Sequence, residues 1–309
     1  MLTAYTLSHG HFTVIPHHLD ENFADMVDCG FDAVALSFSE SEMVYSRRAF
    51  EIQVNLARKR GLKVLVVPSR LGGRFAGAPL MPSIWLYEHP ECVAPADPWL
   101  PVAALEAPAF VDWIKGFMTT LLTDYELDGI IWDEMKEVAM VHRHPATVAR
   151  FGPDPTRENM MDSAIEFIGD LNRHCLAVKP GLSITFFAMR DREYFTQRAA
   201  AAPGVEYFGY DGNLARQSFF HEEPKWVKHR IESMWERTVN ECAAAGKKTF
   251  ALVENMLMPK EAVPEFEANF EAYLQNYRPD HLAVYYYAHN NEDPEAVHGI
   301  VRRLLRRYA

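Results

Sequence analysis

Short apolar, β-branched runs alternate with longer amphipathic runs along the whole chain. Apolar runs of four to eight residues predict strands, and runs with a period near 3.6 predict helices. The predicted strands cover 4–8 (or alternatively 12–15), 33–38, 62–68, 127–132, 182–188, 205–210, 248–253 and 281–287. The predicted helices cover 18–29, 45–60, 109–125, 159–178, 191–202, 225–245, 264–277 and 293–308. Strands that alternate with helices in this way indicate a parallel sheet.

Eight βα units in 309 residues are the number that a (β/α)8 barrel of the α/β class needs. The rival fold is a doubly wound open sheet, which usually carries a Gly-rich phosphate-binding turn after its first strand. The sequence contains neither GxGxxG nor GxxxxGK[ST]. We therefore predict a single TIM barrel over 1–309, with long loops after strands three, four and six, at 71–108, 135–158 and 211–224. All loops that follow strands lie on the face that carries the active site of barrel enzymes.

Three predicted strands run directly into carboxylates. The segment DGIIWDE (128–134) ends in Asp133 and Glu134, and ALVENM (251–256) places Glu254 and its neighbour Asn255 after the seventh strand. Asp211 follows the sixth strand in YFGYDGN. Helix capping and solvated surface acids are the ordinary alternatives, and Asp-Gly-Asn is also common turn chemistry. Because acids at the end of a buried strand are costly to desolvate, we favour a functional interpretation.

Glycoside hydrolysis uses two carboxyl groups, one to protonate the leaving oxygen and one to attack or to activate water. Acids at the ends of strands four and seven can face each other across the mouth at roughly 5–10 Å, the range that both stereochemical routes require. We predict Glu134 and Glu254 as this pair, with Asp133 and Asp211 tuning or orienting them. Strand alternation sends Asp133 and Glu134 to different sides.

The arrangement resembles that of the retaining (β/α)8 glycoside hydrolases, whose acid/base is a Glu ending strand four and whose nucleophile is a Glu ending strand seven. This resemblance implies that Glu134 is the acid/base and Glu254 the nucleophile. That family usually has Asn before the strand-four Glu, where this chain has Asp133. The DGIIWDE segment is more similar to the Asp-Gly-x-x-x-Asp-Glu segment of spherulin-4-like and polygalactosaminidase-like barrels, whose acids at this strand end are thought to serve catalysis. Asp133 is therefore a rival proton donor.

Other side chains near the predicted strand ends are candidates for substrate binding. Two arginines can clamp a carboxylate or a sugar hydroxyl, or else hold an acid in a salt bridge: Arg70 and Arg190. Two residues end strand eight, where a tyrosine can bond the nucleophile or simply pack: Tyr286 and His289. Three tryptophans are candidates for stacking on sugar rings, the last two alternatively anchoring a loop: Trp132, Trp85 and Trp99.

Two groups of histidines raise the question of a metal. His9 and His11 have the HxH spacing of metal-dependent amidohydrolase barrels, but strands five and six end without the histidines that those barrels also use. We therefore expect no metal and no cofactor, and we predict that His9 and His11 contact the substrate. His142 and His144 lie in a locally basic loop, which indicates either an acidic sugar or a solvated segment.

Two other functions remain open. In one, acids from strands four, six and seven and a histidine from strand one hold a divalent cation in a hydrolase or a sugar isomerase or epimerase. In the other, the barrel binds glycans without cleaving them.

Composition and charge limit which binding partners and which cell compartment we expect. The net charge is −11 and the isoelectric point about 5.6, so nucleic acid is not expected as a partner. The four cysteines are scattered without a CxxC pair, which is typical of a reducing compartment. The N-terminal segment lacks a signal-peptide pattern and no 18-residue apolar run occurs. We expect a cytoplasmic enzyme without membrane contact, acting on a small-molecule carbohydrate, with an oligomer possible.

Overall fold

The structure is a computed structural model that describes residues 1–6, 15–77, 81–95, 101–189, 192–217, 229–286 and 290–308. Within these ranges, eight parallel strands pair in chain order and close into a barrel, with the last strand hydrogen-bonded to the first. The strands are β1 (Leu2–Thr6), β2 (Ala33–Ser39), β3 (Lys63–Ser69), β4 (Gly129–Trp132), β5 (Ser183–Phe187), β6 (Tyr207–Gly212), β7 (Lys248–Val253) and β8 (His281–Tyr285). The predicted (β/α)8 fold is confirmed.

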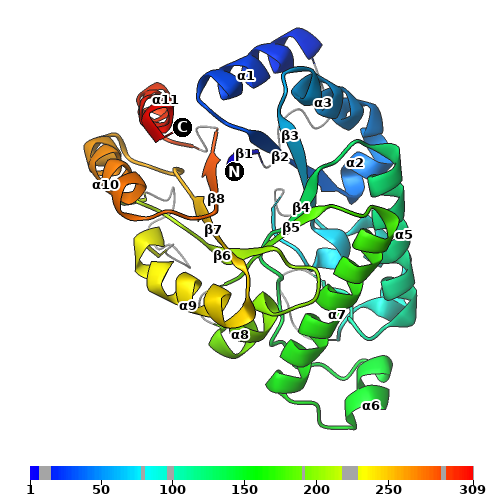
Figure 1. Ribbon diagram of the computed structural model, residues 1–309. Helices are drawn as coiled ribbons and strands as arrows, with labels where there is room; N and C mark the ends of the chain where they lie inside the picture. The colour runs from blue at the N-terminus through cyan, green and yellow to red at the C-terminus, as the bar shows by residue number, and fades with distance from the viewer. Residues whose placement is uncertain are drawn as a thin grey trace.

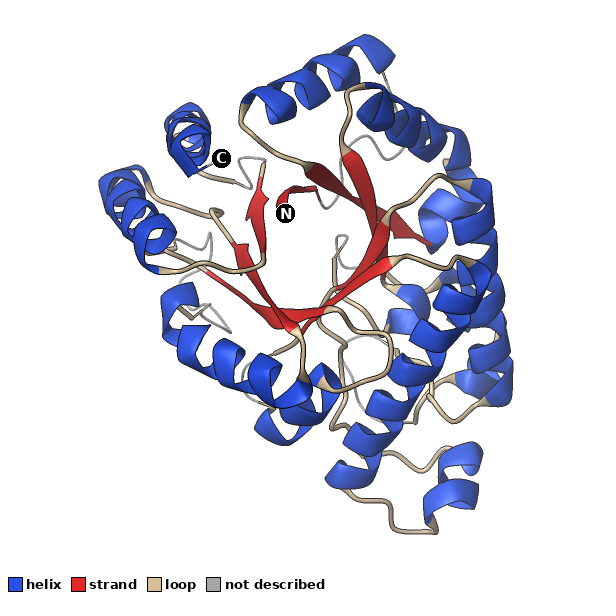
Figure 2. Cartoon of the chain, viewed as in Figure 1, coloured by secondary structure: helices blue, strands red, loops and turns tan. Residues whose placement is uncertain are grey.

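Helices form a ring around the strands, as the view along the barrel axis in Figure 1 and the red strands inside the blue ring in Figure 2 show. The α-helices are α1 (Pro16–Asp28), α2 (Glu40–Tyr45), α3 (Arg47–Lys59), α4 (Ile84–Glu88), α5 (Pro108–Asp124), α6 (Pro145–Phe151), α7 (Arg157–Val178), α8 (Glu193–Ala200), α9 (Trp235–Ala245), α10 (Val263–Asn276) and α11 (Pro294–Tyr308). Short 3-10 turns are η1 (Leu71–Gly73), η2 (Pro90–Cys92), η3 (Ile231–Met234) and η4 (Lys260–Ala262). None of the helices in the described ranges combines the length and apolar character that crossing a bilayer requires.

The strands bury both of their faces, which explains why they are almost entirely apolar. One face of each strand packs into the ring of helices in a large outer cluster. The other face fills the barrel interior, where side chains from different strands stack in layers. The interior cluster consists of Tyr5, Ala33, Ala35, Leu65, Val67, Ile131, Phe187, Phe250, Leu252, Ala283 and Tyr285. These positions fix which side chains near the strand ends point toward the barrel axis.

Two predicted elements near the start of the chain differ from the structure. The first strand, β1, begins two residues before the predicted segment 4–8 and overlaps it, and 7–14 lie outside the described residues. The helix predicted over 45–60 corresponds to α3, and a separate short helix that the sequence pattern did not predict, α2, precedes it. The reason is a capping box, in which the Ser39 hydroxyl accepts from Ser41 N while the Glu42 carboxylate accepts from Ser39 N at 2.6 Å. This box starts α2 directly after β2, and Ser46 then interrupts the helix.

The loops after β3, β4 and β6 are long, as predicted. The first contains η1, α4 and η2, and the second contains α6, which projects from the ring of helices (Figure 1). The sixth strand runs two residues further than predicted, so Asp211 lies within β6 and not in a turn after it. Helix α9 begins at Trp235, later than the predicted 225, and 218–228 lie outside the described residues.

Candidate active site

Three acids point into the mouth of the barrel from three different strands. Asp133 follows Ile131 by two positions and therefore shares its inward direction, as Glu254 does after Leu252. Asp211 pairs in register with Leu252, so it also faces the interior. All three are buried: Asp133 is 6% exposed, Asp211 2% and Glu254 4%. The structure thus brings together one acid each from β4, β6 and β7.

The Asp133 carboxyl is in an environment that favours its neutral form. Burial is the largest cause, and the nearby Glu134 and Asp211 carboxylates add to it, while Tyr5 and Lys136 act in the opposite direction. The result is a pKa of about 7 for Asp133, well above the ordinary 3.8 of an aspartate. A carboxyl that still holds its proton near neutral pH can serve as a general acid.

The phenol of Tyr5 crosses the barrel mouth to reach Asp133. Strands β1 and β4 are not neighbours in the barrel, yet Tyr5 Oη donates to Asp133 Oδ2 at 2.6 Å. The Tyr5 ring packs edge-on against Tyr285, with ring centroids 5.4 Å apart, and against Phe187 at 6.5 Å. Tyr5 is fully buried. The hydroxyl therefore lies among the mouth residues on a ring that the barrel interior holds in place.

A second tyrosine serves Glu254. Tyr285 Oη donates to Glu254 Oε1 at 3.3 Å, and Tyr285 is 4% exposed. Burial raises the pKa of the Tyr285 phenol well above its usual value, and the charges of Glu254, Asp133 and Asp211 all contribute in the same direction. The Tyr285 phenol therefore interacts electrostatically with all three acids, which indicates that the acids share a single site. Beside Glu254, the Asn255 Oδ1 atom is buried without a hydrogen-bond partner among the described residues.

Glu134 points to the other side of the strand end from Asp133. Its Oε2 forms an ion pair with the Lys136 ammonium. Arg70 lies at the end of β3, close to both acids. Burial lowers the pKa of its guanidinium, and the negative charges of Asp133 and Glu134 offset only part of that decrease. Asp133 and Glu134 therefore occupy different environments at the end of one strand, as alternation predicts.

Arg70 has a strained backbone. Its φ of 57° lies in the left-handed region, which is uncommon for residues other than glycine. The turn that follows uses Gly72 and Gly73, also at positive φ, and a Cβ on Gly73 would lie 2.4 Å from Pro101 O. The loop after β3 thus needs these glycines to pass close under the segment near 101–103. Backbone strain of this kind clusters at functional sites. Here it fixes the direction in which the Arg70 side chain extends from the end of β3.

Three predicted substrate contacts lie outside the mouth. Trp132 is fully buried on the outer face of β4, where its Nε1 donates to Asn172 Oδ1 on α7 at 2.8 Å. Tyr286 donates to Asp25 Oδ2 on α1 at 2.7 Å and packs on the outer side of β8. Trp85 stacks on Trp113 of α5, with centroids 4.8 Å apart, and anchors the long loop. The hydroxyl that contacts Glu254 belongs to the neighbouring Tyr285.

The long loop after β3 is tied down by a buried carboxylate. Glu40 Oε1 accepts from Gly72 N at 3.0 Å and Ser83 Oγ at 2.7 Å, and Oε2 accepts from Trp85 N at 2.7 Å. Burial raises the pKa of Glu40, although these hydrogen bonds oppose the rise. Glu40 therefore links the end of β2 to the loop that covers one side of the mouth.

The two histidines of the loop after β4 are buried rather than solvated. His144 Nε2 lies 2.8 Å from Glu91 O, and its Nδ1 accepts from Ala146 N. Burial and the nearby Arg74 cation lower the pKa of His142 to about 4, so this ring is neutral at pH 7. The basic character predicted for this loop therefore does not come from His142.

Several predicted residues lie outside the described part of the chain. They are His9, His11, Trp99, Arg190 and His289.

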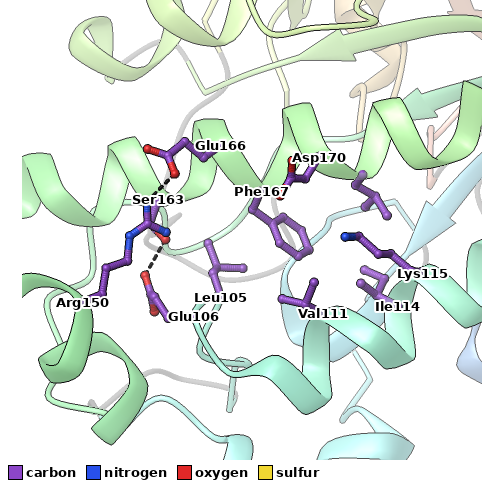
Figure 3. A pocket seen from close by; sticks show the side chains of 11 residues that line it. Leu105, Glu106, Val111, Ile114, Lys115, Arg150, Ser163, Glu166, Phe167 and Asp170 are labelled. Atoms are coloured by element: carbon purple, nitrogen blue, oxygen red, sulfur yellow. Dashed lines mark hydrogen bonds and ion pairs between the residues drawn. The ribbon is translucent and has the colours of Figure 1, made fainter.

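The described cavities do not coincide with the mouth. One of about 190 Å³ lies on the outside, between α5, α6 and α7, with Glu106, Lys115 and Arg150 around an apolar floor (Figure 3). A second, of about 520 Å³, lies between α10 and α11. We locate the candidate site from its carboxylates and tyrosines instead, because neither cavity is lined by an inward-facing acid.

One trio of potential metal ligands is found among the described residues, and it lies on the outer side of the barrel strands. It comprises Asp25, Cys29 and His298, between α1 and α11. The Asp25 carboxylate already accepts from Tyr286 and from the Arg302 guanidinium at 2.8 Å. A cation beside Arg302 would be repelled, so we interpret this trio as an internal polar cluster. All four cysteines are buried free thiols.

A closed barrel with inward acids at its strand ends is the fold of many (β/α)8 glycoside hydrolases, and solved structures of that class resemble this chain. A β-galactosidase from the psychrophilic Marinomonas ef1 matches 99% of the chain, with a TM-score of 0.67 and 9% identity. An α-L-fucosidase from Paenibacillus thiaminolyticus matches 99%, with a TM-score of 0.62 and 12% identity. The glycoside hydrolase domain of PelA from Pseudomonas aeruginosa matches 92%, with a TM-score of 0.53 and 14% identity.

The extent of these matches differs. The chain spans 59% of the β-galactosidase chain and 48% of the fucosidase chain, but 93% of the PelA domain. Comparison with protein-family models and with curated proteins gave no match. At identities of 9–14% the structural likeness establishes the (β/α)8 barrel fold alone, and the chemistry has to be argued from the site.

Proposed function

We propose that the protein is a glycosidase that hydrolyses an oligosaccharide or glycoconjugate with carboxylates of β4 and β7. The observation that carries this proposal is the convergence of Asp133, Asp211 and Glu254 around Tyr285. Two carboxyl groups with different protonation states are what the reaction requires. Asp133, with its raised pKa, supplies the neutral acid, and Glu254 supplies the carboxylate that attacks the anomeric carbon or activates water.

Two acids at the end of β4 compete for the role of proton donor. Glu134 has the position that the resemblance to retaining enzymes favours, but its carboxylate is engaged by Lys136. Asp133 lies with Tyr5 on the inner side, where a bound sugar would be, so we favour Asp133. In this proposal Glu134 raises the Asp133 pKa by its negative charge, and Asp211 does the same from β6.

Neighbouring groups would orient the substrate. Tyr285 holds Glu254, and the buried Asn255 amide next to it offers hydrogen-bonding capacity at the same strand end. Arg70 would bind a hydroxyl or carboxylate of the sugar from the β3 side. We also retain His9, His11, Arg190 and His289 as proposed substrate contacts, because residues that follow the strands of barrel enzymes commonly contribute to the active site.

Hydrolysis can be tested on a panel of oligosaccharides by measuring newly formed reducing ends. We expect Asp133→Asn and Glu254→Gln each to lower turnover by about 10³-fold or more, because each removes a group that acts in the transition state. Glu134→Gln serves as the matched control for a neighbouring acid and should cost much less. If Glu134→Gln abolishes turnover while Asp133→Asn does not, Glu134 is the donor. If turnover persists in both the Asp133 and Glu254 variants, the carboxylate mechanism is wrong.

The alternative metal-dependent function has a separate test. Chelator treatment of the purified protein should leave turnover unchanged if the carboxylates act alone. Loss of activity on chelation, restored by a divalent cation, would favour a metal-dependent hydrolase or a sugar isomerase instead.

A further inference from the structure

We infer that Tyr5 is a positioning residue for Asp133: its hydroxyl, delivered across the mouth from β1, holds the carboxyl in place and controls how readily it releases its proton. This inference rests on the proposed function for its catalytic meaning. The hydrogen bond itself is a separate structural fact that can be tested without substrate.

The geometry carries the inference. Tyr5 Oη lies 2.6 Å from Asp133 Oδ2, within the usual range for a hydroxyl bonded to a carboxylate. The ring cannot swing away easily, because Tyr285 and Phe187 pack edge-on against it and the side chain has no exposed surface. Because its ring is held in place, the Tyr5 hydroxyl can donate to the same oxygen, Asp133 Oδ2, whenever the carboxyl loses its proton.

Tyr5, Lys136 and Arg70 favour the charged form of Asp133, whereas burial and the neighbouring acids Glu134 and Asp211 disfavour it. The ionisable groups around this carboxyl come from five strands or their ends: Tyr5 from β1, Arg70 after β3, Glu134 and Lys136 after β4, Asp211 from β6 and Tyr285 from β8. A hydroxyl that donates to the ionised carboxylate stabilises the charged form and lowers the pKa. Tyr5 therefore offsets part of the rise caused by burial and by the two neighbouring acids.

The functional consequence is that Asp133 is neither too weak nor too strong an acid for catalysis near neutral pH. Burial alone would leave Asp133 too weak an acid to give up its proton quickly. A fully solvated aspartate would be ionised at neutral pH and unable to donate. The hydroxyl of Tyr5 brings the carboxyl toward neutral pH, where an acid catalyst works best. The same bond keeps the carboxyl oriented after it has released its proton.

The test measures the protonation of Asp133 directly. Carbon-13 NMR of aspartate-labelled protein, with the resonance assigned by its loss in Asp133→Asn, gives the titration midpoint of this carboxyl. We expect Tyr5→Phe to raise the midpoint by about one unit, a tenfold weaker acid, because the donor is removed and the ring is kept. The high-pH limb of kcat/KM should move upward by the same amount.

A matched control is Tyr210→Phe. Tyr210 also donates from a buried ring to a carboxylate, that of Glu241, but on the outer side of β6. This substitution should leave the Asp133 midpoint unchanged. Should Tyr5→Phe fail to fold, 3-fluorotyrosine at position 5 tests the same bond: a more acidic hydroxyl is a stronger donor, and the midpoint should fall.

The outcomes separate the two proposals. A midpoint that stays the same or falls in Tyr5→Phe, or stays the same or rises with fluorotyrosine, overturns the role of Tyr5 whatever the activity does. A midpoint that shifts as expected supports that role. In that case, an Asp133→Asn variant that still hydrolyses glycans would overturn only the assignment of Asp133 as the catalytic acid.

Discussion

At the scale of single residues, the site depends on one aspartate that the barrel keeps from ionising. The buried position of Asp133 lowers the stability of the folded state at neutral pH. In the unfolded chain Asp133 ionises near pH 4, whereas in the folded chain it keeps its proton up to about pH 7. Between these values the folded state binds more protons than the unfolded state, so stability falls as pH rises. Above about pH 7 the whole cost is present, and below about pH 4 it disappears.

The asparagine variant should reveal this cost. We expect Asp133→Asn to be more stable than the wild type at pH 8, by a few kcal/mol, since each unit of pKa shift corresponds to about 1.4 kcal/mol. The gain should shrink steadily toward pH 4. Urea unfolding at pH 4, 6 and 8 measures it. A variant that is equally stable or less stable than the wild type at pH 8 would contradict the raised pKa.

At the scale of elements, the mouth is shaped by loops that are fastened to the barrel from inside. Glu40 is placed by the capping box that starts α2 straight after β2, and from there it accepts from two backbone N–H groups of the next loop. Arg74 adds a second tie, because its Nε donates to Ala103 O at 2.7 Å. These hydrogen bonds hold the loop, with its short helices η1, α4 and η2, beside the site.

Removing Glu40 should loosen this loop without unfolding the barrel. Glu40→Ala leaves the buried N–H groups of Gly72 and Trp85 without acceptors, at about 1–3 kcal/mol each. We expect faster hydrogen exchange across 71–88 and unchanged exchange in α10, measured by mass spectrometry. Unchanged exchange across 71–88 would show that Glu40 does not fasten the loop.

The sequence could specify these elements better than it could orient them. Strand and helix alternation identified all eight βα units, because each strand is a short apolar run bounded by glycine, proline or polar residues. Strands that are buried on both faces carry no inside–outside signal, however. For this reason Trp132 and Tyr286 were expected at the mouth and lie outside, while Tyr285 and Tyr5 were missed. Tyr285 lies beside Glu254 because β7 and β8 pair with Val253 opposite Val284, and the sequence pattern does not specify this register.

At the scale of the whole molecule, the barrel is closed by contacts between the first and last units. Asp25 on α1 accepts from Tyr286 beside β8 and, on α11, from Arg302 at 2.8 Å and His298 at 2.9 Å. These charge-assisted bonds join segments that are more than 260 residues apart in sequence. Register at the β1–β8 seam therefore has support from the helical ring as well as from the strand ladder.

Asp25→Ala should destabilise the protein by about 2–4 kcal/mol, because Tyr286 and His298 lose their carboxylate partner and Arg302 keeps only its contact with Asp28. The midpoint of urea unfolding should fall with an unchanged slope. Asp28→Ala is the control: its carboxylate also pairs with Arg302, at 3.0 Å, but its side chain is 60% exposed, so its loss should cost about 0–1 kcal/mol. Equal effects of the two variants would mean that Asp25 is not a closing contact.

The central claim is that acids from β4 and β7 act on one sugar bond. The most direct measurement is a crystal structure of Asp133→Asn with an oligosaccharide that the wild type cleaves. We predict one glycosidic oxygen within hydrogen-bonding distance of the residue-133 amide, and the Glu254 carboxylate near the anomeric carbon. Side chains of residues 133 and 254 should be roughly 5–10 Å apart. A glycan bound away from these side chains, or one that only Glu134 contacts, would contradict it.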